Sequence, residues 1–174
     1  TPSGTDPGAC RRICEALLRH RRVVVTSHMR PDGDAIGSSL ALAWALREIG
    51  TDARVVHRDR APIQLEDFPG IADIEIGDTV PAGMEAAVVL ECGDLARTGL
   101  SGFDGLPVIN IDHHPGNTGY GETQWFDGTY AACGEMVFEI IAELGVPLTA
   151  DMAEAHSFTW HGTGQSLLEA SSRD

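Results

Sequence analysis

Short apolar runs alternate along the chain with longer stretches in which apolar residues recur every three or four positions. A continuous apolar run is typical of a strand buried on both faces, and the longer spacing is typical of a helix with one buried face. Strands are therefore predicted over residues 23–26, 53–57, 86–90, 106–111 and 125–126. Helices are predicted over residues 8–20, 34–49 and 131–144, and from residue 149 onward.

The order of these elements indicates the fold class. Strands that alternate with helices predict an α/β fold, with a mostly parallel sheet flanked by helices. A length of 174 residues suits one domain with a full hydrophobic core. We assign residues 8–155 to this domain. Residues 59–83 are rich in Pro, Gly and acidic side chains, and we expect a loop there with one short helical turn.

The charge of the chain narrows the range of partners. The formal net charge is −14, all 12 basic residues are Arg, and the chain contains no Lys. Such an acidic domain repels a long polyanion, whereas nucleic-acid-binding domains usually present a basic stripe. We therefore expect no binding to duplex DNA. A small or short anionic substrate that is reached through a bound metal ion fits this charge better.

The sequence shows no sign of a membrane or of an oxidising compartment. Apolar stretches stay below the ~18 residues that a membrane-spanning helix needs, and the first residues lack the basic and apolar regions of a signal peptide. We expect a cytoplasmic protein without a membrane anchor, and the sequence does not indicate an oligomeric state. Its cysteines are expected to be reduced and mostly buried: they are Cys10, Cys14, Cys92 and Cys133.

A first cluster of polar residues directly follows the predicted strand over 23–26. His28, Asp32 and Asp34 place one imidazole and two carboxylates within seven residues. Gly33 and Gly37 would let the backbone turn tightly and let an anion approach the start of the next helix. A role in binding a metal ion or a phosphate explains this combination better than a solvated loop does.

A second cluster, Asp112-His113-His114, follows the predicted strand over 106–111. The carboxyl ends of neighbouring parallel strands converge on one crevice, where open α/β sheets place their ligands. Adjacent side chains point in different directions, so the two imidazoles are expected to differ in role. One can bind a metal ion while Asp112 or a carbonyl group fixes its tautomer.

Residues after the predicted strand over 86–90 are further candidates. Glu91 and Asp94 could each bind a metal ion, and the strand-end position favours Glu91. Arg97 could bind a phosphate through two parallel hydrogen bonds, or it could be a solvated surface residue. His20 and His57 lack companion ligands and are predicted to be surface or packing residues.

Three motifs together resemble the DHH phosphoesterase family, in particular its nanoRNase/pAp phosphatase branch. They lie at residues 28–38, 89–94 and 110–115, and the resemblance extends from about residue 10 to residue 154. It implies that residues 8–155 are a DHH catalytic domain. It also implies a metal-dependent phosphoesterase that hydrolyses short single-stranded oligoribonucleotides, 3′-phosphoadenosine 5′-phosphate, or both.

The same resemblance implies a centre with two metal ions, usually Mn²⁺, with Mg²⁺ or Co²⁺ as possible substitutes. His28 and Asp32 would hold one ion, and Asp34 and His113 would hold the other. Glu91, where many members have Asp, would bridge the two. Imidazole and carboxylate ligands suit Mn²⁺, and two ions ~3.5–4 Å apart can activate a water molecule for attack on phosphorus.

The implied catalytic residues are His114, which would face the substrate phosphate, together with Asp112 and Arg97. The chain departs from the family at its fourth motif, Asp-Thr-Gly, because Gly162 stands where the ligand Asp is expected. A sequence error or frameshift, a decayed copy and a functional variant are the alternatives, and in the last of these His161 is a candidate replacement ligand. By this comparison we expect residues 156–174 to be a divergent or truncated tail and the family's second, substrate-binding domain to be missing, and we expect weak or no turnover.

Two other kinds of function remain open. A catalytically inactive module that binds a metal ion or a nucleotide would use the same residues. Other DHH phosphohydrolases are inorganic pyrophosphatases, cyclic di-adenylate phosphodiesterases and single-strand exonucleases. Hydrolysis and Mn²⁺ binding measured together separate these alternatives, because binding without turnover favours the inactive module.

Overall fold

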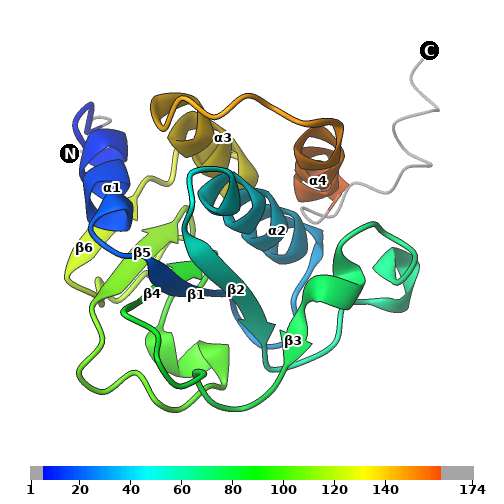
Figure 1. The fold of residues 1–174 in the computed structure, drawn as a ribbon, viewed down its shortest axis with the longest axis horizontal. Coiled ribbons are helices and arrows are strands. Elements are labelled where there is room, and N and C mark those ends of the chain that lie inside the picture. The colour runs from blue at the N-terminus through cyan, green and yellow to red at the C-terminus, as the bar shows by residue number, and fades with distance from the viewer. Residues whose placement is uncertain (1–5, 162–174) are drawn as a thin grey trace.

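The computed structural model describes residues 6–161, which form one six-stranded sheet and the helices packed on it (Figure 1). The strands are β1 (Arg22–Thr26), β2 (Asp52–His57), β3 (Glu75–Ile76), β4 (Ala86–Leu90), β5 (Val108–Asp112) and β6 (Thr123–Phe126). The α-helices are α1 (Ala9–Leu18), α2 (Gly33–Glu48), α3 (Cys133–Glu143) and α4 (Ala150–His161). Short 3-10 helices span Ile63–Leu65, Ile71–Asp73 and Leu95–Thr98.

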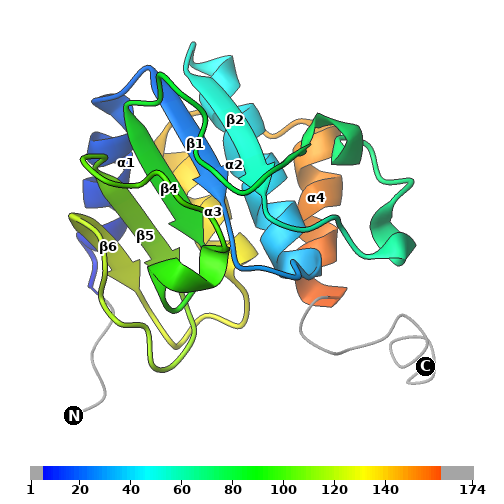
Figure 2. The ribbon, with the colours of Figure 1, turned by 90° about the horizontal axis from the view of Figure 1, so that it is seen from below.

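The predicted α/β fold with a parallel sheet is confirmed. The strand order is β3-β2-β1-β4-β5-β6, and every neighbouring pair is parallel (Figure 2). The chain runs outward from β1 through β2 to β3 and then returns to β4 on the other side of β1. This reversal opens a crevice outside the carboxyl ends of β1 and β4, which is where α/β sheets bind their ligands.

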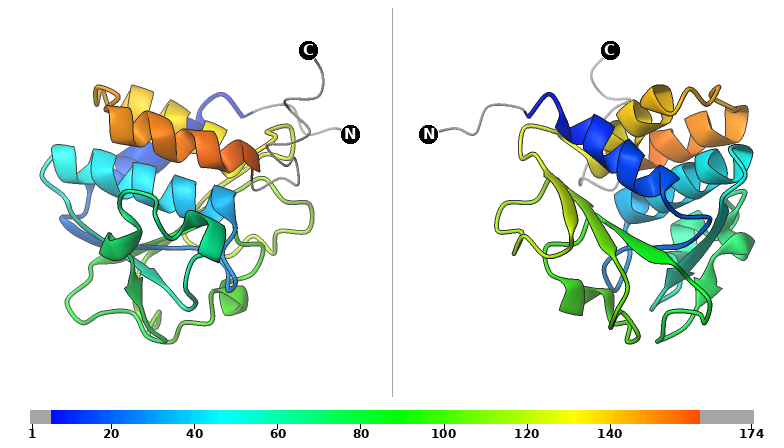
Figure 3. Two further views of the ribbon diagram at one scale, coloured as in Figure 1. Left: turned by 90° about the vertical axis from the view of Figure 1, so that its right-hand side faces the viewer. Right: turned by 60° about the vertical axis from the view of Figure 1, so that its left-hand side comes forward.

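The two faces of the sheet are covered differently. All the α-helices of the described residues lie on one face (Figure 3). Val23 and Val25 of β1 contribute to the core on that face. Val24 points the other way, into a smaller core that includes Leu95 and Phe103 from the connection between β4 and β5. Burial on both faces explains why residues 23–25 of β1 are an unbroken apolar run.

Helix α2 is buried on almost every side because it lies between the sheet and α4. α4 approaches it closely at Gly37, where a methyl group would overlap the carbonyl oxygen of Ala155. Gly134 of α3 allows a similar approach, because a methyl group there would overlap the side chain of Thr159. α4 therefore packs against the N-terminal turns of α2 and α3, which lie beside the crevice.

None of the helices in this described range combines the length and the apolar character needed to cross a membrane. Gly162, where the family's fourth motif was expected, lies outside the described residues. The side chain of His161 also lies outside the part of the chain that the structure describes.

Candidate metal centre

The loop after β1 places two carboxylates at the start of α2. Asp32 is the N-cap residue of α2, and its Oδ1 accepts a hydrogen bond from the Ala35 amide at 2.9 Å. Its other oxygen, Oδ2, lies 3.9 Å from His28 Nε2. One oxygen of Asp32 thus holds the helix, while the other faces an imidazole and is available to a cation.

Asp34 is fully buried and connects two helices. Its Oδ2 accepts a hydrogen bond from the Cys133 amide at 2.9 Å, and its Oδ1 accepts bonds from the Gly134 amide at 3.0 Å and the Ser38 hydroxyl at 3.1 Å. These amides begin α3, whose N-cap residue Ala132 has no capping side chain. Asp34 therefore supplies the missing cap from another helix and satisfies amides that would otherwise be unpaired.

Burial raises the pKa of Asp34, but the neighbouring His113 and the donors of α3 outweigh this effect and lower the pKa overall. Asp34 Oδ2 lies 3.5 Å from His113 Nε2. The carboxylate is therefore held in its ionised form, in one orientation and facing an imidazole nitrogen.

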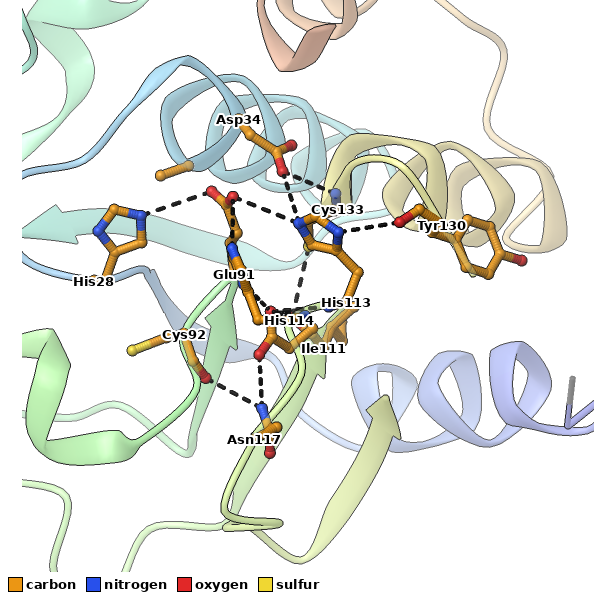
Figure 4. A network of polar contacts seen from close by, with 12 residues as sticks. His28, Asp34, Glu91, Cys92, Ile111, His113, His114, Asn117, Tyr130 and Cys133 are labelled. Atoms are coloured by element: carbon orange, nitrogen blue, oxygen red, sulfur yellow. Dashed lines mark hydrogen bonds and ion pairs between the residues drawn. The ribbon is translucent and has the colours of Figure 1, made fainter. Parts of the chain in front are cut away.

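Glu91 stands directly after β4 and lies at the centre of the cluster (Figure 4). Its backbone has φ = 53°, in the left-handed region that non-glycine residues rarely adopt, and its side chain is only 3% exposed. Oε2 lies 3.7 Å from His28 Nε2, and Oε1 lies 3.6 Å from His113 Nε2 and 3.7 Å from His114 Nε2. One carboxylate thus faces imidazoles on two sides.

The three imidazoles share one arrangement. Each Nδ1 lies within hydrogen-bond distance of an acceptor: His28 with the Met29 carbonyl at 2.6 Å, His113 with the Tyr130 carbonyl at 3.1 Å, and His114 with Asp112 Oδ1 at 2.7 Å. Because each Nδ1 donates its hydrogen there, each Nε2 is left to face the carboxylates. An orienting hydrogen bond of this kind is typical of histidines that bind metal ions.

The spacing of these atoms fits a cation between them. The distances from Nε2 to a carboxylate oxygen are 3.5–3.9 Å, longer than a good hydrogen bond. Two ligands that each lie about 2.1 Å from a shared ion are about 3–4 Å apart. Glu91 Oε2 and His113 Nε2 are buried and have no hydrogen-bond partner among the described residues, as expected for atoms whose partner is a metal ion.

Two groups of side chains in the described range could each hold a cation. One consists of His28, Asp32 and Glu91, and the other of Glu91, His113 and His114. Both groups contain Glu91, and Asp34 contacts the second through His113. The five residues expected to bind metal ions are thus brought together around one shared carboxylate.

The model of the DHH family's N-terminal domain matches residues 22–158 of the chain. The chain belongs to the DHH family. The Asp-His-His triplet at residues 112–114 stands at the carboxyl end of β5, beside the shared carboxylate.

Among curated proteins, this DHH chain is 37% identical over 134 residues to the bifunctional oligoribonuclease and PAP phosphatase NrnA of Thermus thermophilus. That alignment covers 75% of the chain but only 40% of the relative. The crystal structure of an exopolyphosphatase-related protein from Bacteroides fragilis superimposes with a TM-score of 0.80 at 21% identity, over 94% of this chain and 52% of the other. Manganese-bound exonuclease RecJ matches with a TM-score of 0.53 at 18% identity, over 86% of this chain and 41% of the other.

Asp112, the first residue of the DHH triplet, is fully buried and already engaged at both oxygens. Oδ1 accepts from His114 Nδ1 and from the amides of His113 and His114, at 2.7, 2.8 and 3.2 Å. Oδ2 accepts from Asn117 Nδ2 at 2.8 Å. The geometry suits a residue that orients His114, rather than one that binds a metal ion directly.

Two candidates that follow β4, Asp94 of the second DHH motif and the later Arg97, lie outside the two groups. Asp94 Oδ1 accepts a hydrogen bond from the Ala96 amide at 2.9 Å and caps the 3-10 helix over Leu95–Thr98. Arg97 is exposed, and its carbonyl accepts from the Met29 amide at 2.8 Å. The structure thus brings Glu91 into the cluster, whereas Asp94 has a local structural contact and Arg97 lies at the rim.

His57, which was predicted to be a surface or packing residue, is fully buried and lies outside both groups. Its Nε2 lies 3.1 Å from the Ser39 hydroxyl, and burial lowers the pKa of His57 to about 4. The sequence did not single out Asn117, the Tyr130 carbonyl or the amides of Cys133 and Gly134. Main-chain groups have no residue-specific signature, and an Asn in a Gly-rich loop more often indicates only a turn.

The DHH centre holds protons where a metal ion would lie. The facing carboxylate of Glu91 raises the pKa of His28 to about 8, and that of Asp34 raises the pKa of His113 to about 10. Burial raises the pKa of Glu91 itself to about 7. In metal-free protein near neutral pH, His28 and His113 therefore carry positive charge that offsets the carboxylates.

Binding of Mn²⁺ is expected to release protons and to become tighter as the pH rises. Each raised pKa means that the folded, metal-free protein keeps a proton that must leave before the ligand atom can bind. Affinity should therefore increase about tenfold per pH unit for each proton released, between about pH 6 and pH 8. Titration calorimetry in two buffers with different ionisation heats counts these protons. A His20→Ala control should behave like the unmodified chain, and an affinity that does not change with pH would contradict the expectation.

Proposed function

We propose that the chain is the catalytic domain of a phosphoesterase that uses two divalent metal ions to hydrolyse short oligoribonucleotides, 3′-phosphoadenosine 5′-phosphate, or both. The observation that carries this proposal is the position of Glu91, whose two oxygens face His28 on one side and His113 and His114 on the other. The substrate class rests on the name of the Thermus relative, an oligoribonuclease and PAP phosphatase. That relative is much longer than this chain, so its activities come to this domain as a proposal.

The proposed ligands divide into two sets that share Glu91. His28 and Asp32 would hold one ion, and Asp34 and His113 the other. Oxygen and imidazole donors suit Mn²⁺, and the matching RecJ structure contains manganese. When bound, such ions draw electron density from the phosphoryl oxygens and lower the pKa of water.

The residues of the chain would perform the remaining tasks. The side chain of His114 is 45% exposed, so its Nε2 can reach both the cluster and a phosphate in the crevice. Asp112 accepts the hydrogen of His114 Nδ1 and keeps Nε2 free to accept or return a proton. Arg97 has no ion pair among the described residues and stands at the rim, where its guanidinium could bind a phosphate through two hydrogen bonds.

A short substrate also agrees with the charge of the chain. The net charge of −14 disfavours a long polyanion, whereas bound divalent ions would attract one or two phosphates locally.

We further propose that residues 8–155 make up the catalytic domain. Helix α4 extends to His161, so its last turn lies in the segment assigned to the tail.

The test is hydrolysis by the 174-residue chain with Mn²⁺ or chelator, using 3′-phosphoadenosine 5′-phosphate, RNA of two to five nucleotides and pyrophosphate in parallel. We expect weak hydrolysis of the first two that disappears with chelator. Tight Mn²⁺ binding without hydrolysis of any substrate would replace the proposal with the inactive binding module. Hydrolysis of pyrophosphate alone would replace it with a pyrophosphatase.

A further inference from the structure

Asn117 lies in the loop between β5 and β6, and its amide joins three parts of the site. Nδ2 lies 2.8 Å from Asp112 Oδ2, 3.2 Å from Asn110 Oδ1 and 3.3 Å from the Cys92 carbonyl (Figure 4). Oδ1 accepts from the Gly119 amide at 2.9 Å and from Asn110 Nδ2 at 2.9 Å. Because a backbone amide can only donate and an ionised carboxylate can only accept, these contacts determine which way the Asn117 amide points.

The contact with Asp112 leads directly to His114. Asn117 is the only hydrogen-bond donor to Asp112 Oδ2 in the described part of the chain. Together with the His113 and His114 amides, which hold Oδ1, this bond fixes the plane of the carboxylate and directs Oδ1 at His114 Nδ1, 2.7 Å away. The opposite nitrogen of that ring, Nε2, then faces Glu91 Oε1 at 3.7 Å. A line of contacts therefore runs from Asn117 through a buried carboxylate to the exposed imidazole of the centre.

The Cys92 carbonyl, unlike Asp112 Oδ2, has a second hydrogen-bond donor besides Asn117. Cys92 directly follows Glu91, and its carbonyl also accepts a hydrogen bond from the Tyr120 hydroxyl at 2.6 Å. Loss of Asn117 would leave that carbonyl with a donor, whereas Asp112 Oδ2 would have none among the described residues. Removing Asn117 should therefore affect Asp112 and His114 in addition to its own contacts with Asn110 and Gly119.

We propose that Asn117 is a positioning residue, which sets the tautomer and the orientation of His114 by holding the Asp112 carboxylate. This inference rests on the proposed function for its effect on catalysis. The expected effect of Asn117 on the orientation and tautomer of His114 is independent of the proposed function. His28 and His113 provide an internal comparison, because main-chain carbonyls hold their Nδ1 atoms.

The kinetic test compares Asn117→Ala and Asn117→Asp in the full chain, with Tyr120→Phe as the matched control. Asn117→Ala should lower kcat about 10–100-fold with little change in KM, as is typical when the partner that orients a site residue is lost. Asn117→Asp keeps the shape but loses the donor, so it should do no better. Tyr120→Phe removes a hydrogen bond to the same loop without touching Asp112, and it should retain most activity. An equal loss in Tyr120→Phe would overturn the proposal in favour of general loop stability.

A double substitution gives a second readout. If Asn117 acts through His114, Asn117→Ala should cost little further activity in a His114→Ala background. Additive losses would mean that Asn117 acts by another route, and they would overturn the proposal. Thermal unfolding of each variant accompanies the kinetics, so that a loss of folded protein is not counted as a loss of kcat.

An NMR measurement on metal-free protein distinguishes failure of this inference from failure of the proposed function. The imidazole nitrogen spectrum, recorded at a pH high enough for His114 to be neutral, should show His114 with its hydrogen on Nδ1 in the unmodified chain. In Asn117→Ala, the tautomer signature of His114 should change while the imidazole signals of His28 and His113 stay the same. An unchanged His114 signature overturns the proposal even in an active enzyme, and a changed one supports it even if no tested substrate is hydrolysed.

Discussion

Replacing Glu91 with glutamine is expected to lower Mn²⁺-dependent hydrolysis by at least about 100-fold, beyond the loss seen when only the partner of a metal ligand is removed. The reason is that one carboxylate faces both ligand groups, so a neutral amide weakens both at once. The fold should remain intact, because burial raises the pKa of Glu91 to about 7. Near neutral pH, part of the protein already contains Glu91 in its protonated, uncharged form, and glutamine has the same shape as that form.

Hydrolysis rates of Glu91→Gln with Mn²⁺ measure this effect, calorimetric titration with Mn²⁺ measures the weakened metal binding, and thermal unfolding with chelator checks the fold. Glu91→Asp is the matched control, because it keeps the charge and shortens the side chain by one methylene. We expect it to retain part of the affinity and activity. If Glu91→Gln still bound two ions with unchanged affinity, Glu91 would not bridge them.

Replacing Asp34 with alanine is expected to damage both metal binding and the fold. It would remove the acceptor for two buried amides of α3 and for the Ser38 hydroxyl. Unsatisfied buried polar groups cost about 1–3 kcal/mol each, so we expect a loss of about 3–5 kcal/mol in the free energy of unfolding. A loss of that size approaches the total stability of many domains.

Urea unfolding in the presence of chelator measures the Asp34→Ala effect without any contribution from a metal ion. Asp32→Ala is the control, since Asp32 is also an expected ligand that faces His28, but among the described residues its side chain makes one hydrogen bond, the N-cap bond from the Ala35 amide. Removal of such a cap typically costs ~1 kcal/mol. Equal destabilisation by the two substitutions would show that the bonds from Asp34 to α3 do not stabilise the fold.

Most of the fold could be predicted because its strands have simple patterns. β4 is apolar throughout and β1 is apolar over residues 23–25, and Gly50 and Gly145 directly follow the C-cap residues of α2 and α3. β3 was missed because it has only two residues, both exposed, and therefore no apolar run. The expected single helical turn between β2 and β4 proved to be two 3-10 helices, which depend on local packing more than on periodicity.

The members of the site could be inferred from position, whereas their connections could not. His28, Glu91 and His113 each follow a strand, and parallel strands bring such residues together. The left-handed backbone of Glu91 and the capping of α3 by Asp34 depend on contacts between segments far apart in the sequence. The roles of the individual ligands therefore stay predictions that the experiments above can test.

The groups that accept the Nδ1 hydrogens of His28, His113 and His114 differ in how sensitive they are to substitution. His28 and His113 are oriented by the carbonyls of Met29 and Tyr130, which any amino acid at those positions would supply. His114 is oriented by a side chain that another side chain holds in turn. Substitutions of the residues that anchor His28 and His113 should therefore leave the orientation of those two rings unchanged. Few substitutions of the residues that anchor His114 should preserve the orientation of its ring.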